Sequence, residues 1–130
     1  MVIDSSAIVA ILFGEPEAEG FLTRLAMADV CRLSAATFLE VGIVLHRAQA
    51  AKRRPAFEEM LRLFAIKIEP VTEQHAFLAL DAFERFGKGT SHPAGLNYGD
   101  CFSYALAKET GEPLLFKGND FRRTDLVAAD

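Results

Sequence analysis

The sequence predicts an α/β fold in which a short parallel β-sheet is sandwiched between α-helices. Two observations support this. Short apolar segments of strand length alternate with longer segments of helical periodicity along the chain, and capping residues or glycines separate them. Such alternation is typical of a parallel sheet covered on both faces, because each crossover helix packs against the sheet.

The length and composition indicate one globular domain over residues 1–130. Apolar residues make up 51% of the chain and charged residues 25%, which excludes a disordered protein. No apolar run could cross a membrane, and no signal peptide is recognised. Cys31 and Cys101 match no metal-binding spacing, so we expect buried thiols and a cytoplasmic location. The net charge of −4 argues mildly against nucleic-acid binding.

Strands are expected where short apolar segments lie between turn signals. The first is Val2-Ile3, which is followed directly by Asp4. Further strands are predicted over residues 30–33, 66–69 and 114–116, with a last one over 125–128.

Three polar residues are N-cap candidates because each directly precedes a helix-forming stretch. They are Ser34, Thr72 and Asn97. They predict helices over residues 35–50, 73–86 and 98–110, the last of which ends at Gly111 in the left-handed conformation. Apolar periodicity, a Gly-Glu-Pro break and a Pro in a first turn add helices over residues 7–13, with Ser5 or Ser6 as the cap, 17–28 and 55–64.

Four acidic residues stand at positions where they could meet. Asp4 closes the first strand and Asp120 follows the buried strand at 114–116, so both belong at the carboxyl edge of the sheet, where ligands gather. Asp100 lies in the first turn of its helix, where the helix dipole favours an anion. Glu40 lies in the second turn of another helix, among apolar residues that make an unpaired carboxylate costly.

The chemistry of the site follows from their joint placement, since each acid alone also has an ordinary explanation as a cap, a turn former or a surface residue. Two carboxylates about 4 Å apart repel by on the order of 4 kcal/mol at an effective dielectric near 20, and a cation would relieve this. An all-oxygen ligand set favours Mg²⁺, or Mn²⁺, over Zn²⁺. Such an ion activates water and binds phosphate, so phosphodiester hydrolysis is the natural reaction.

Several segments resemble the PIN domain, and specifically the VapC toxins of bacterial type II toxin–antitoxin systems. The resemblance spans essentially the whole chain, and its later blocks are long and specific. Tyr98 stands where the family often has Phe. The matching segments are residues 1–7 with the first acid, residues 96–107 with the third, residues 113–121 with the fourth, and Glu40 at the position of the second.

The resemblance implies a Mg²⁺-dependent endoribonuclease that a cognate VapB-type antitoxin holds inactive. It implies Asp4 and Asp100 as the principal metal ligands. Glu40 and Asp120 would complete the site directly or through water. The supporting hydrogen bonds would come from Ser6 and Asn97.

Other residues are weaker candidates for contacts with RNA or a partner. The long flexible stretch at residues 87–95 could bring Lys88 and His92 to RNA or the antitoxin, and Lys117 could neutralise phosphate near Asp120. A plain surface role explains each of these equally well. Apolar residues around 57–64 and 12–13 exceed what a small core hides, so we expect a homodimer or a toxin–antitoxin hetero-oligomer.

The sequence favours three other functions less strongly. A receiver-like Mg²⁺-binding signalling domain also uses acids at strand ends, but the segment 66–71 ends in Glu69-Pro70 with no Asp to accept phosphate. A phosphatase with Asp4 as nucleophile usually has a second Asp two residues later, where this chain has Ser6. A non-catalytic protein-binding module is disfavoured by the intact set of acids.

Overall fold

The sheet is short and entirely parallel. In the computed structural model, which describes residues 1–129, the strands pair in the order β3-β2-β1-β4. This confirms the α/β sandwich predicted from the sequence. The strands are β1 (Val2–Ile3), β2 (Arg32–Ser34), β3 (Lys67–Glu69) and β4 (Leu114–Leu115).

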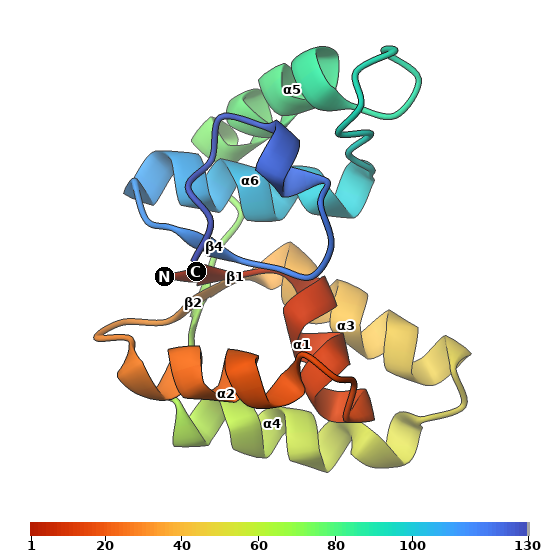
Figure 1. Ribbon diagram of the computed structural model, residues 1–130, viewed down its shortest axis with the longest axis vertical. Coiled ribbons are helices and arrows are strands. Elements are labelled where there is room, and N and C mark those ends of the chain that lie inside the picture. The colour runs from red at the N-terminus through yellow and green to blue at the C-terminus, as the bar shows by residue number, and fades with distance from the viewer. Residues whose placement is uncertain (130) are drawn as a thin grey trace.

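Helices cover both faces of this sheet (Figure 1). The helices α5 and α6 lie on one side, and α1 to α4 lie on the other. The bounds are α1 (Ser5–Phe13), α2 (Ala18–Met27), α3 (Ala35–Arg47), α4 (Arg54–Leu63), α5 (Glu73–Phe86) and α6 (Tyr98–Thr110), with single 3₁₀ turns η1 (Ala51–Arg53) and η2 (Phe121–Arg123).

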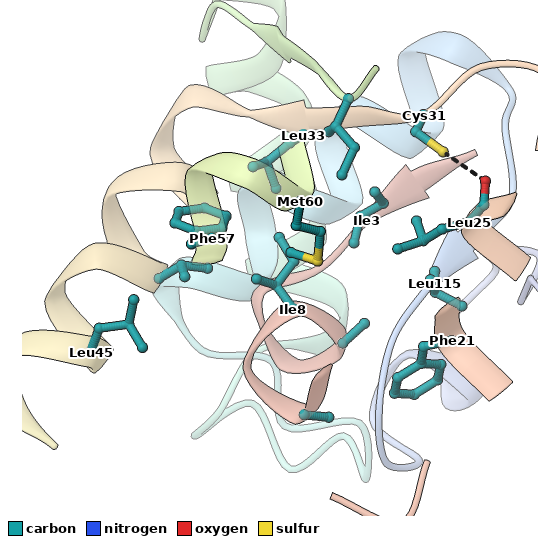
Figure 2. Close-up of a cluster of buried hydrophobic side chains, with 14 of the residues drawn as sticks. Ile3, Ile8, Phe21, Leu25, Cys31, Leu33, Leu45, Phe57, Met60 and Leu115 are labelled. Atoms are coloured by element: carbon teal, nitrogen blue, oxygen red, sulfur yellow. Dashed lines mark hydrogen bonds between the residues drawn. The ribbon is translucent and has the colours of Figure 1, made fainter. Parts of the chain in front are cut away.

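Alternation along the central strands divides the core into two clusters. Val2 and Leu114 belong to the cluster under α5 and α6, whereas Ile3 and Leu115 belong to the cluster under α1 to α4. Figure 2 shows the second of these, in which Ile3 and Leu115 meet side chains from four helices. Successive residues of a strand point to opposite faces, so two-residue strands suffice to anchor both layers.

The order in which the strands are added to the sheet reverses at β1. It runs outward from β1 to β2 and β3, and then returns to place β4 on the other side of β1. The Asp4 N–H donates to the Leu115 carbonyl at 2.9 Å, so the loops that leave these two strands separate at this point. In open parallel sheets such a switch point, at the carboxyl ends of the strands, is the preferred place for a ligand.

The three predicted N-caps are confirmed. The side-chain oxygens of Ser34, Thr72 and Asn97 accept hydrogen bonds from the backbone N–H groups of the first turns of α3, α5 and α6. Gly111 adopts a left-handed φ of 67° and ends α6, as predicted.

Some boundaries differ from the prediction. The cap of α1 is Asp4, which accepts the Ser6 N–H, so the prediction of Ser5 or Ser6 as the cap was wrong. The predicted strand over residues 125–128 is reduced to one parallel bridge between Leu114 and Ala128, because only this part of the chain runs beside β4.

The prediction of exposed apolar faces around residues 57–64 and 12–13 was also wrong in its location. Phe57 and Met60 are buried, and Leu12 and Phe13 pack against the core. Leu63 is the exposed exception on α4. The largest exposed apolar side chains elsewhere include Leu39 of α3, Phe77 and Leu80 of α5 and Tyr98 of α6.

Both cysteines are free and buried, as expected. The Sγ of Cys31 is directed at the Leu25 carbonyl (Figure 2). Among the described residues, no helix has the length and apolar character needed to span a membrane.

Candidate active site

Asp4 is the buried centre of the switch point. The residue is only 1% exposed to solvent. One carboxylate oxygen, Oδ2, accepts hydrogen bonds from the N–H of Ser6 at 2.9 Å and from its hydroxyl at 2.7 Å. The other, Oδ1, accepts one from the hydroxyl of Ser103 at 2.6 Å. These donors, together with the N-terminus of α1, stabilise a negative charge that would otherwise be costly to bury.

Ser6 connects the two loops that leave the switch point. Besides donating to Asp4, its hydroxyl oxygen accepts the backbone N–H of Lys117 at 3.0 Å. The loop after β4 is thereby tied to the start of α1. Ser6 thus joins Asp4, the start of α1 and the loop after β4.

Asp100 begins α6 within a reciprocal cap. The Asn97 side chain accepts the Asp100 N–H at 2.9 Å, and Asp100 Oδ2 accepts the Asn97 N–H at 2.8 Å. The pKa of Asp100 is raised to about 7: burial raises it most, the hydrogen bond from the Asn97 N–H lowers it, and the negative charges of Asp4, Glu40 and Asp120 raise it. The structure therefore brings Asp4, Glu40 and Asp120 within electrostatic range of Asp100, and Asp4 within range of Glu40.

Glu40 reaches the start of α6 from the neighbouring helix α3. Burial raises the pKa of its carboxyl group; a hydrogen bond from Ser5 lowers it, and the charge of Asp4 raises it. Its Oε2 is buried and has no hydrogen-bond partner among residues 1–129. A Cβ placed on Gly99 would lie 2.3 Å from Glu40 Oε1, so only glycine at this position leaves room for the carboxylate.

Asp120 and Lys117 lie on the exposed rim of the site. Asp120 precedes η2 and is exposed, but it contributes to the raised pKa of Asp100. The Lys117 ammonium forms ion pairs with Glu15 and Glu17. In this arrangement the Lys117 ammonium lies against the loop after α1. Its backbone N–H, which donates to the Ser6 hydroxyl, is the group of Lys117 that contacts the candidate site.

The loop at residues 87–95 is ordered by internal contacts. Lys88 is exposed and its N–H donates to the Leu96 carbonyl at 2.8 Å. His92 accepts the Ala94 N–H on Nδ1 at 3.1 Å and packs edge-on against Phe86. Arg123 of η2 donates to the Pro93 carbonyl, which holds the loop beside the segment that follows Asp120. His92 therefore has a packing role here, while Lys88 points to solvent.

The donor set fits a small divalent cation. Within residues 1–129, no three Asp, Glu, His or Cys side chains are gathered closely enough to share one metal ion. Mg²⁺, however, is typically bound through one or two carboxylates and several waters. The unpartnered Oε2 of Glu40 and the raised pKa of Asp100 both indicate negative charge that a cation at this edge would stabilise.

The model of the PIN domain family matches residues 1–127 of this chain. The chain belongs to this family. Ribonuclease VapC28 of Mycobacterium tuberculosis is 50% identical over 129 residues, covering 99% of this chain and 97% of its own. Ribonuclease VapC of Mycolicibacterium smegmatis is 46% identical over 128 residues, covering 98% of each chain. Within the PIN domains, the chain is therefore one of the VapC ribonucleases, the metal-dependent nuclease toxins that the sequence resembled.

Solved structures of other proteins show the same fold. Mycobacterium tuberculosis VapC20, described as a toxin that cleaves the sarcin-ricin loop, superimposes with a TM-score of 0.75 at 19% identity, covering 97% of this chain and 95% of that one. A toxin–antitoxin complex from Klebsiella pneumoniae gives a TM-score of 0.66 at 17% identity, with 92% and 88% covered. Family membership excludes the receiver and phosphatase alternatives.

Several residues of the candidate site were not predicted from the sequence. Ser103 lies one helical turn after Asp100 in α6, and Thr37 lies one turn before Glu40 in α3. A hydroxyl three residues from an acid lies on the same helix face, and this spacing was the available signal. The steric requirement at Gly99 depends on two segments far apart in the chain, and no local pattern reveals it.

We expect Gly99→Ala to displace Glu40 and to lower nuclease activity by about 10- to 100-fold, the usual cost of disturbing a group beside a metal site. Alanine favours a helix over glycine by about 1 kcal/mol, so the melting temperature should change little. Gly42→Ala is the matched control, because a Cβ there meets nothing within 4 Å. Equal activity of the two variants would contradict the steric argument.

The raised pKa of Asp100 predicts a pH-dependent stability of the cation-free protein. Because its folded pKa, about 7, lies above the unfolded value of 3.8, its contribution is fully present below the unfolded pKa and is lost as the pH rises through 7. In EDTA, the melting temperature of the wild type should fall between about pH 4 and pH 7, and Asp100→Asn should reduce that fall. Asp81→Asn, at an exposed position of α5, should leave the profile unchanged.

Proposed function

We propose that this PIN domain hydrolyses RNA phosphodiester bonds at the edge of the sheet where Asp4, Glu40, Asp100 and Asp120 converge. The observation that supports this best is the electrostatic coupling of Asp100 to the other three acids. Four carboxylates from four separate segments have no role in folding that requires them to approach one another. A divalent cation, Mg²⁺ or Mn²⁺, is the group that such a set would hold.

Asp4 and Asp100 are the proposed principal ligands, because both are fixed in place by hydrogen bonds from the protein. When bound, the ion would lower the pKa of a water molecule and neutralise charge on the scissile phosphate. The unpartnered Oε2 of Glu40 can accept a hydrogen bond from water, and exposed Asp120 can do so at the rim. Hydrolysis would form a bond from the water oxygen to phosphorus and break the bond from phosphorus to the leaving ribose oxygen; the water would lose a proton and the ribose oxygen would gain one.

Supporting groups would hold this arrangement rather than react. Ser6 and Asn97 restrain Asp4 and Asp100. Lys88, on the surface of the loop at residues 87–95, could contact the RNA backbone, as could Lys117 after release from its glutamates. His92 would support the loop by packing on Phe86.

We also propose a VapB-type antitoxin as the protein that neutralises the enzyme, and a homodimer as the assembly of the toxin. An apolar groove of about 520 Å³ between α5 and α6 supports a protein partner. Leu80 on its rim is 55% exposed and Tyr98 is 79% exposed, next to the acids. Its lining is Ala76, Ala79, Leu80, Phe83, Tyr98, Cys101 and Phe102.

The reaction is tested by incubating the purified chain with RNA in Mg²⁺, Mn²⁺ or EDTA. We expect cleavage that EDTA abolishes, and a loss of at least about 100-fold in Asp4→Asn and Asp100→Asn. Asparagine at position 100 still accepts a hydrogen bond, so the start of α6 is retained. Asp81→Asn serves as the surface control.

Cleavage that persists equally in EDTA and in both acid variants would come from a contaminating nuclease and would overturn the proposal. Binding of RNA without cleavage in any metal would indicate a non-catalytic module instead.

The assembly is tested by light scattering of the purified chain. The wild type should be a dimer, and Leu80→Asp should shift it to a monomer because the charge would be buried at the interface between the two protomers. Leu63→Asp is the matched control, since Leu63 is 63% exposed on α4, outside the groove. A monomeric wild type would overturn the homodimer.

A further inference from the structure

Two buried hydroxyl groups extend inward from Asp4. Ser103 donates to Asp4 Oδ1 at 2.6 Å, and the Thr37 hydroxyl lies 3.3 Å from the Ser103 hydroxyl. Ser103 is 0% exposed and Thr37 is 1% exposed. The three side chains come from the end of β1, from α6 and from α3, so this chain of hydrogen bonds joins the elements that bear Asp4, Asp100 and Glu40.

The direction of these hydrogen bonds follows from the chemistry of the groups. An ionised carboxylate can only accept, so the single hydroxyl proton of Ser103 must point at Asp4. The Ser103 oxygen then offers only lone pairs to Thr37, and Thr37 must be the donor in that contact. Thr37 therefore holds the hydroxyl of Ser103 in the one orientation that serves Asp4.

The lone pairs of the Asp4 carboxylate limit how many hydrogen bonds or metal contacts it can make. A carboxylate offers about four lone-pair positions, two on each oxygen. Ser6 uses both positions on Oδ2 through its N–H and its hydroxyl, and Ser103 uses one on Oδ1. One lone pair of Oδ1 remains for a ligand from outside.

We propose that Ser103 and Thr37 are positioning residues that fix the rotation of the Asp4 carboxylate, so that one lone pair of Oδ1 is presented to the cation. Packing alone does not explain the two hydroxyls. Alanine and valine would fill nearly the same volume at these positions, and replacing both members of a buried hydrogen-bonded pair by apolar groups is often nearly neutral for stability. The inference rests on the proposed metal site.

The test measures Mn²⁺ affinity by electron paramagnetic resonance, without RNA, on variants whose folding is followed by melting temperature. Ser103→Ala should weaken Mn²⁺ binding by about 10- to 100-fold, as is usual for a group that orients a metal ligand. Thr37→Val keeps the shape of the side chain but loses the donor, and should weaken binding in the same direction. Thr37→Ser keeps the donor and should retain wild-type affinity.

Thr110→Val is the matched control. Thr110 lies on the same helix as Ser103, but its hydroxyl donates to the Leu106 carbonyl, away from the acids. This variant should bind Mn²⁺ as the wild type does.

A wild-type affinity in Ser103→Ala and Thr37→Val would overturn the inference, as would an affinity loss in Thr37→Ser equal to that in Thr37→Val. A wild type that binds Mn²⁺ and shows the expected variant effects, yet leaves RNA intact, would overturn the proposed reaction and support this inference. A wild type that does not bind Mn²⁺ would overturn both.

Discussion

The burial of one carboxylate charge constrains the rest of this structure. Asp4 stands at the end of the central strand, almost without solvent contact, where an uncompensated charge would be costly. The groups that compensate it come from the start of α1 and from α6, ninety-nine residues later in the chain. The same contacts fix where α1, α6 and the loop after β4 stand relative to the sheet. Stability and the proposed chemistry therefore depend on the same few hydrogen bonds.

The other acids show how one residue can serve both local structure and the site. Asp100 is a complete member of a capping box, a motif found in many helices with no catalytic role. Its position next to three further acids, and not its hydrogen bonds, makes it unusual. Gly99 illustrates the converse, because it contributes no functional group and yet decides how closely Glu40 approaches the helix.

The parts of this architecture that depend on local pattern were predictable from the sequence. N-caps such as Thr72 and Asn97, the stop at Gly111 and the alternation of strands and helices are recorded within a few adjacent residues. Contacts between distant segments were not predictable. The ion pairs of Lys117 join residues about one hundred positions apart, and the hydroxyls of Thr37 and Ser103 meet only once the sheet has formed. The prediction of a last strand over residues 125–128 was wrong for a related reason, since a strand forms only where a neighbouring strand exchanges hydrogen bonds with it.

The helix caps formed by Asp4 and Asp100 have a consequence for ion discrimination. Asp4 Oδ2 accepts two hydrogen bonds from Ser6, one of which caps α1, and Asp100 Oδ2 accepts one from the Asn97 N–H. A cation that took both oxygens of Asp4 would have to displace one of the Ser6 donors, at a cost of about 1 kcal/mol, or roughly fivefold in affinity, whereas at Asp100 it would share Oδ2 with the cap. Ca²⁺ commonly binds carboxylates through both oxygens, whereas Mg²⁺ takes one oxygen from each in an octahedral arrangement. A hydrogen bond that begins a helix would thus act against the larger ion, and the secondary structure itself would contribute to the selectivity of the proposed metal site.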